Sequence, residues 1–257
     1  MLQMLRRLFS PATMASKSHG LTDRGMVREN NEDGFGIMDG ANIFMVADGM
    51  GGHNGGEVAS KLAIETLIAS LKGDTANRLH GNPTAIRHTL TRGFEIANDT
   101  VRKQAKGNPD LKGMGCTLVC ALVDGHTLHC CHVGDARCYI YTPGEGLKQV
   151  TTDHTTLVQY QMALESEETM PELPPRNVVT RVIGYPFPEP PEYHAVPLTP
   201  GCRVILCSDG LWSMVDDNEL LEIISRASSP EDACKKLVDR ANEAGGTDNI
   251  TTLTIFV

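Results

Sequence analysis

Short apolar runs that follow one another with only tight turns between them most constrain how this chain folds. Uninterrupted runs at 43–47 and 204–207, an alternating one at 251–257, and others at 35–38, 117–123, 128–133 and 138–141 predict strands. Asp39-Gly40 and Asp124-Gly125 join neighbouring runs as hairpin turns. Because parallel strands need a long crossover between them, this order predicts mostly antiparallel sheets.

Helical spacing of apolar residues appears in three segments, around 64–71, 86–101 and 233–241. The third has clear ends. Ser229-Pro230-Glu231 supplies an N-cap, a first-turn proline and an acidic first turn, and Gly245-Gly246 stops the helix. We therefore expect an α+β fold in which helices cover the outer faces of the sheets.

The 257 residues, 40% of them hydrophobic, suffice for one large domain or two small ones, and no repeat or linker divides them. We expect a frayed leader over residues 1–18, because chain termini are usually poorly ordered. A single domain is then expected over residues 19–257. Its segment at about 153–192 is acidic and proline-rich, which predicts a functional flap or a variable loop.

Charge and cysteine usage narrow the classes of partner. The net charge is −9 and no basic cluster is present, which argues against nucleic-acid binding. No apolar stretch is long enough for a transmembrane helix, and the first residues lack the apolar core of a secretory signal. The eight cysteines show no paired spacing and resemble buried hydrophobic residues of a reducing compartment. We therefore expect a cytoplasmic protein without membrane insertion.

Several acidic residues stand where predicted strands begin or end. Two follow uninterrupted apolar strands, and two directly precede strands. In antiparallel neighbours, the start of one strand lies beside the end of the next. The acidic residues expected to converge on one sheet edge are Asp33, Asp48, Asp209 and Asp248, with Glu32 beside them.

Carboxylates gathered at one edge repel one another unless cations compensate their charge. An all-oxygen ligand set suits Mg²⁺ or Mn²⁺, and two such ions would support phosphoester hydrolysis by an activated water. Arg28, four residues before Glu32, is placed to bind the phosphate bidentately. The alternative is that these acids are independent turn and cap residues on an acidic surface.

Five segments, in order along the chain, resemble the metal-dependent serine/threonine protein phosphatases of type 2C, in the pattern of their bacterial branch. They are RENNED at 28–33, VADGMGG at 46–52, GDAR at 134–137, SDGLW at 208–212 and TDNIT at 247–251. The resemblance implies a four-layer αββα sandwich with a flap. It also implies direct attack of a metal-bridging water or hydroxide on phosphoserine or phosphothreonine, with phosphorylated proteins as substrates and a cognate Ser/Thr kinase. We expect a monomer.

The resemblance also implies roles for individual residues. Two Mn²⁺ or Mg²⁺ ions are implied, bridged by Asp48, with the Gly49 carbonyl as a further ligand of one and Asp209 with Asp248 as ligands of the other. Glu32 and Asp33 would hold metal-bound waters, and Arg28 would bind phosphate. Asp135 would help to hold a third, weaker ion. Met50 stands where many eukaryotic members have a histidine proposed as general acid, so that role is unassigned here.

Two other functions compete with this hypothesis. Cys131 and Arg137 fit the C-x5-R spacing of cysteine-dependent phosphatases. That chemistry requires a helix N-terminus after the loop, whereas a strand is predicted after Arg137. The second alternative is a non-catalytic binding module with a phosphatase fold, which would be expected to lack metal-binding acids, yet all of them are present.

Overall fold

The computed structural model describes residues 16–51, 55–72, 79–165 and 178–257. Residues 1–15 of the predicted leader and residues 166–177 of the predicted flap lie outside the described residues. The first strand, β1 (Lys17–Asp23), begins inside the segment expected to be a leader. It pairs along its whole length with the last strand, which ties this part of the chain into a sheet.

Two five-stranded sheets form the centre of the molecule. The first has the order β1, β12 (Ile250–Phe256), β11 (Arg203–Cys207), β8 (Arg137–Thr142) and β9 (Gly146–Gln149). The second has the order β10 (Glu192–Pro197), β7 (Thr127–Val133), β6 (Leu118–Asp124), β3 (Ile43–Ala47) and β2 (Gly34–Met38). Neighbouring strands in both sheets pair antiparallel, which confirms the expectation from the hairpin turns.

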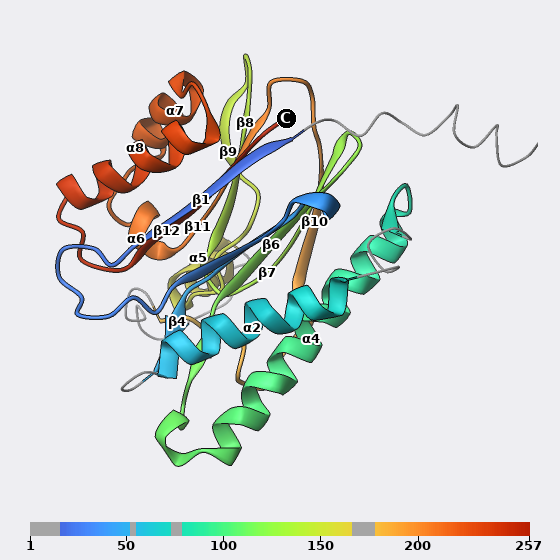
Figure 1. The fold of residues 1–257 in the computed structure, drawn as a ribbon, viewed down its shortest axis with the longest axis vertical. Helices are drawn as coiled ribbons and strands as arrows, with labels where there is room; N and C mark the ends of the chain where they lie inside the picture. Colours follow the sequence, from blue (N-terminus) through green and yellow to red (C-terminus); the bar gives the residue numbers. More distant parts are fainter. Residues whose placement is uncertain (1–15, 52–54, 73–78, 166–177) are drawn as a thin grey trace, which may run out of the picture.

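Helices cover both outer faces, so the chain forms the expected four-layer αββα sandwich (Figure 1). One face carries α2 (Gly55–Leu71) and α4 (Pro83–Gly107). The other carries α6 (Asp209–Trp212), α7 (Asp217–Arg226) and α8 (Pro230–Glu243). A ribbon of β4 (Gly49–Met50) and β5 (Gly115–Cys116) leaves the end of the second sheet. The short helix η1 (Asp39–Ala41) connects β2 to β3, and η2 (Pro109–Leu111) precedes β5.

Three apolar layers hold the sandwich together. The inner one lies between the two sheets and includes Leu128 and Leu253. The outer two lie between each sheet and its helices. All eight cysteines are buried and unpaired, as the composition indicated. Strands that are apolar on both faces, such as β3, pack on a helix layer and on the other sheet at once.

Local signals explain the elements that the sequence predicted and those that it missed. Ser229 Oγ accepts the Asp232 amide at 3.1 Å and caps α8 as expected. The predicted flap instead contains helix α5 (Thr156–Glu165), and its end at 192 is where β10 begins. We did not predict α5, α7, β1, β9 or β10. β10 was missed because its sequence, EYHAVP, lacks an apolar run.

We expect Leu253→Ala to lower the free energy of unfolding by about 2–5 kcal/mol, because the side chain is fully buried between the sheets and leaves a cavity. Chemical denaturation followed by circular dichroism measures this change. Val27→Ala, at a side chain that is 65% exposed, should change stability by less than about 0.5 kcal/mol. Equal effects of the two substitutions would contradict the position of Leu253 in the core.

Candidate metal centre

A hollow of about 450 Å³ opens at one end of the two sheets, and seven of the eight predicted site residues line it. Asp33 is the exception, although the charges of Asp209 and Asp248 act on its carboxyl group. The hollow is lined by Arg28, Glu32, Asp48, Gly49, Met50, Gly51, Thr117, Asp135, Val178, Val179, Asp209, Asp248 and Asn249. Strand-end carboxylates therefore converge as the antiparallel order predicted.

The acidic side chains come from separate elements that end at the same place. Asp48 stands between β3 and β4, and Asp209 is the first residue of α6, two positions after β11. Asp135 lies in the turn between β7 and β8. Asp248 precedes β12, as Glu32 and Asp33 precede β2. These elements are spread along the chain, and the two sheets bring together the strand ends that carry the acidic residues.

Gly49 allows the backbone segments under the hollow to approach closely. A Cβ atom at this position would lie 2.2 Å from the Gly56 carbonyl oxygen and 2.5 Å from that of Glu32. The Gly49 amide donates to the Glu32 carbonyl oxygen at 3.2 Å. Gly49 therefore serves close backbone packing beside Asp48.

Asn249 connects the loop that carries Arg28 and Glu32 to the segment that carries Asp248. Its Oδ1 accepts the Glu32 amide at 2.8 Å. Its Nδ2 donates to the carbonyl oxygens of Arg24 at 2.9 Å and Asn30 at 2.8 Å. No role was predicted for Asn249 from the sequence. The available signals were its position directly after Asp248 and its place within the TDNIT segment.

Electrostatics in this hollow are dominated by uncompensated carboxylates. Burial, with Asp209 nearby, raises the pKa of Asp33 and of Asp135 to about 7. Burial and the carboxyl groups of Asp33 and Asp209 raise the pKa of Asp48 well above its ordinary value. Arg28 is the only basic residue among the described residues lining the hollow, and it is half-exposed. An all-oxygen set with so little compensating charge fits hard divalent cations such as Mg²⁺ or Mn²⁺.

Arg28 and Asp248 form an ion pair at the rim, with Nη2 2.7 Å from Oδ2. Asp33 is held differently, because its Oδ2 accepts the Ser208 hydroxyl at 2.6 Å. Ser208 Oγ also accepts the Thr251 amide at 3.0 Å. The ion pair joins two predicted site residues, and the Ser208 hydroxyl joins a third, Asp33, to a segment that is distant in the sequence.

The turn that bears Asp135 is held from two sides by Asp153 and His154, which we had expected only as the start of the flap. Asp153 accepts a bidentate pair of hydrogen bonds from Arg137, at 2.9 Å and 2.7 Å. His154 binds both sides of Gly134, since its amide donates to the Gly134 carbonyl at 3.0 Å and its Nδ1 accepts the Gly134 amide at 3.1 Å. Asp135 is thereby fixed in position.

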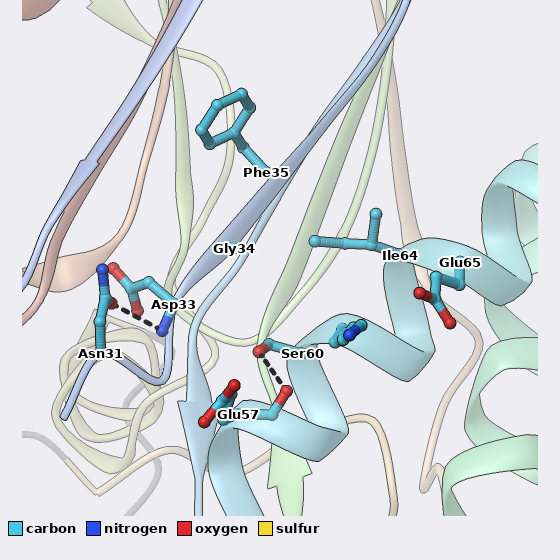
Figure 2. Close-up of a pocket in the computed structure, with 9 residues that line it drawn as sticks. Asn31, Asp33, Gly34, Phe35, Glu57, Ser60, Ile64 and Glu65 are labelled. Atoms are coloured by element: carbon cyan, nitrogen blue, oxygen red, sulfur yellow. Dashed lines mark hydrogen bonds between the residues drawn. The ribbon is translucent and has the colours of Figure 1, made fainter.

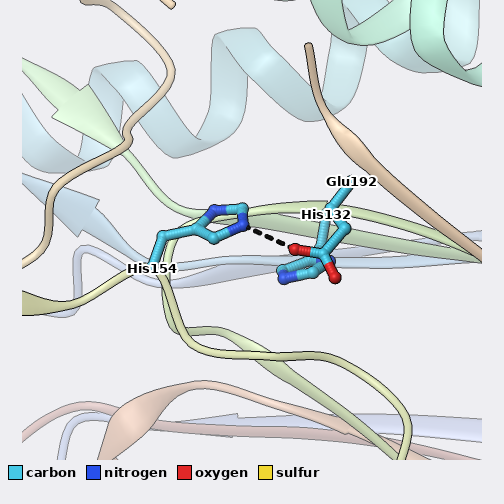
Figure 3. A group of neighbouring side chains, drawn as sticks. All are labelled: His132, His154 and Glu192. Carbon is cyan, nitrogen blue, oxygen red and sulfur yellow. Dashed lines mark hydrogen bonds and ion pairs between the residues drawn. The ribbon is translucent and has the colours of Figure 1, made fainter. Parts of the chain in front are cut away.

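His132, His154 and Glu192 form a further cluster beside this turn (Figure 3). Their ligand atoms lie within 4.8 Å of one another, a spacing that a metal ion could bridge. Because His154 Nδ1 accepts the Gly134 amide, the neutral ring carries its proton on Nε2 and donates it to Glu192 at 3.0 Å. The two imidazole rings are also stacked, with centroids 4.6 Å apart. This hydrogen bonding leaves His154 no lone pair for a metal.

A second hollow, of about 360 Å³, lies between β2 and the first turns of α2. Figure 2 shows the Asn31 to Asp33 turn on one side and Glu57 and Ser60 on the other. Ser60 Oγ donates to the Glu32 carbonyl at 2.6 Å, so α2 is fixed to the loop under the predicted site. Asp33, Glu57 and Glu65 outnumber the one lysine of the lining, Lys61, so the hollow is acidic overall.

Comparison with known proteins agrees with this geometry. Residues 26–244 match the Protein phosphatase 2C family. The chain belongs to this family. It is 34% identical over 238 residues to the serine/threonine phosphatase stp of Listeria monocytogenes, covering 91% of this chain and 93% of that protein.

Solved structures of family members show the same fold. The crystal structure of the serine/threonine phosphatase PstP/Ppp of Mycobacterium tuberculosis superposes with a TM-score of 0.79 at 32% identity, covering 94% of this chain and 98% of that one. A structure of the PstP catalytic domain in complex with two manganese ions superposes with a TM-score of 0.76 at 31% identity, covering 94% and 97%. The sequence resemblance to type 2C phosphatases is thus confirmed.

Cys131 and Arg137 do not form the site of a cysteine-dependent phosphatase. Cys131 is fully buried within β7, and burial raises the pKa of its thiol well above the ordinary value. Arg137 begins strand β8 and is paired with Asp153. The loop therefore lacks the helix N-terminus that would hold a phosphate and activate the thiol.

Without a divalent cation, we expect the carboxyl groups to make the free energy of unfolding fall as the pH rises from 6.5 to 7.5. The ordinary pKa of Asp33 and Asp135 is 3.8 and their folded pKa is about 7, so the folded chain binds more protons than the unfolded chain in this interval. Each carboxyl should contribute about 0.5–1 kcal/mol. Thermal denaturation in chelator measures the change, and Mn²⁺ added at pH 7.5 should raise Tm.

Asp135→Asn is the control for this pH dependence, because it removes one of the titrating groups. The Tm of the variant should fall less between the two pH values. His129 and His132, whose pKa values burial lowers, act in the opposite sense chiefly below pH 6.5, and they are shared by both proteins. An identical pH dependence in the wild type and the variant would contradict the raised pKa of Asp135.

Proposed function

We propose that the chain is a metal-dependent protein serine/threonine phosphatase that hydrolyses phosphoserine and phosphothreonine in proteins. The observation that carries this proposal is the convergence of five carboxylates and Arg28 on one hollow. Membership of the Protein phosphatase 2C family supports it, as does the presence of two manganese ions in the related PstP structure.

In this proposal, Asp48, the Gly49 carbonyl, Asp209 and Asp248 hold two Mn²⁺ or Mg²⁺ ions. Glu32 and Asp33 hold waters of the ions, and Asp135 helps to hold a third, weaker ion. When bound, the cations supply positive charge at the phosphate and an activated water for in-line attack. Burial of the carboxylates supports these roles, because a cation relieves their mutual repulsion.

Arg28 is proposed to bind the phosphate of the substrate. Its Nη2 donates to Asp248, which fixes one edge of the guanidinium group, and its other N–H donors have no hydrogen-bond partner among the described residues and can bind phosphate oxygens. Half of its side chain is exposed, so an incoming phosphate can reach it. Met50, also at the rim, carries no titratable proton and cannot act as general acid.

We also propose that residues 19–257 act as a single catalytic domain, that the protein is a cytoplasmic monomer, and that a Ser/Thr kinase supplies its substrates. Within the described part of the chain, no helix is long and apolar enough to cross a membrane. The net charge of −9 supports the exclusion of nucleic acid as a partner.

Asp209→Asn should lower kcat/KM for a phosphothreonine peptide by at least about 100-fold, because replacing a direct ligand costs more than the 10- to 100-fold loss typical of groups behind a ligand. Release of phosphate in the presence of Mn²⁺ measures this. Asp239→Asn, an exposed carboxylate on α8, should retain the wild-type rate. Activity that survives chelator but is abolished by thiol alkylation would overturn the metal-dependent mechanism.

A further inference from the structure

Exposed apolar side chains gather around the hollow. Among the described residues, five large hydrophobic side chains are exposed: Met26, Val27, Met50, Val178 and Tyr185. Met26 and Val27 directly precede Arg28, and Met50 and Val178 both line the hollow. The Tyr185 hydroxyl donates to the Gly113 carbonyl at 3.0 Å. Exposed apolar residues concentrated at one place are typical of a surface that contacts another protein.

A basic groove of about 500 Å³ lies beyond Tyr185. It is lined by Arg102, Ala105, Lys106, Pro109, Lys112, Gly113, Gly184 and Pro186. Arg102 and Lys106 are four residues apart on the last turns of α4 and share one face of the helix. None of the described lining residues is acidic, although the chain as a whole has a net charge of −9. The groove is therefore a local concentration of positive charge.

The cations of the basic groove are available to a ligand. Lys106 and Lys112 are exposed, and their side-chain ammonium groups form no hydrogen bond or ion pair with another described residue. Arg102 has one weak contact, in which its Nη1 lies 3.8 Å from Asp99 Oδ1. A negatively charged ligand would therefore not have to displace a strong internal partner.

The ribbon of β4 and β5 separates the basic groove from the candidate metal centre. Met50, which lines the metal centre, pairs with Gly115, and Gly113 of the groove is two residues before Gly115. Across the ribbon, Ile183 bridges to Cys116 and is followed by Gly184 of the groove. From Met50 to Gly113 the path crosses one strand pair, about 5 Å, and two residues of chain, at most about 6.6 Å. Since extended chain advances about 3.3 Å per residue, a peptide needs roughly three to five residues to reach from the metal centre into the groove.

We propose that the basic groove binds acidic side chains of the phosphoprotein substrate, three to five residues from the phosphorylated residue, while the exposed apolar residues contact the intervening segment. This inference rests on the proposed phosphatase function. The hollow beside α2 has three acidic lining residues, Asp33, Glu57 and Glu65, against one lysine, Lys61, so the preference for acidic residues applies to one side of the phosphorylated residue only.

The experiment compares phosphothreonine peptides hydrolysed by the full chain with Mn²⁺. One pair of peptides carries three Glu or three Gln residues at positions 3–5 after the phosphothreonine, and a second pair carries them before it. For one of these directions, kcat/KM should be roughly 3- to 10-fold higher with Glu, as expected for two or three exposed charge pairs. The gain should disappear at high salt, because exposed charges are screened.

Lys106→Glu/Lys112→Glu should abolish the preference for Glu and leave the hydrolysis of p-nitrophenyl phosphate unchanged. Arg92→Glu/Lys235→Glu makes the same change in net charge at exposed positions outside the groove and should retain the preference. Equal rates on Glu and Gln peptides, or the same loss in both variants, would overturn the groove while the phosphatase function stands. No hydrolysis of any substrate, p-nitrophenyl phosphate included, would contradict the phosphatase function and the groove with it.

Discussion

Mutual repulsion between buried carboxylates is the constraint on which the functional end of this molecule depends. Asp48, Asp135 and Asp209 are held close together where burial already disfavours their charged forms. A fold that gathers such groups must hold them by other contacts, since they do not attract one another. The packed sheets supply most of that support, because each of these residues lies just beyond the end of a strand whose apolar residues are in the core.

Neutral hydrogen bonds supply the rest of the support. Asn249 uses its side-chain amide to bind three backbone groups of the loop that bears Arg28 and Glu32. The Ser208 hydroxyl donates to Asp33 and accepts the Thr251 amide, and it thereby links Asp33 to β12. Such contacts position the acidic loops without adding charge to the hollow. A cation can then bind to carboxylates that are already in place, which lowers the cost of ordering them on binding.

The sequence predicted the part of the site that depends on strand order and missed the part that depends on side-chain contacts. Asp48 and Asp209 follow apolar strands, so their place at a sheet edge could be derived from the alternation of strands and turns. Asn249 and Ser208 have no such pattern, because their partners come from distant segments. Strand β10 was not predicted because its sequence lacks an apolar run. It forms a strand because it pairs with β7, a segment that is distant in the sequence.

His154, just before α5, connects the turn that bears Asp135 to the segment that follows α5. Its side chain and amide hold Gly134, while its carbonyl accepts the Thr180 amide at 2.7 Å. On the return, Val178 accepts the Thr156 amide at 2.9 Å and lines the candidate metal centre. Both ends of the described flap are therefore connected by hydrogen bonds to the turn that bears Asp135. The rim of the hollow and the turn that bears Asp135 thus share hydrogen bonds to one residue, His154.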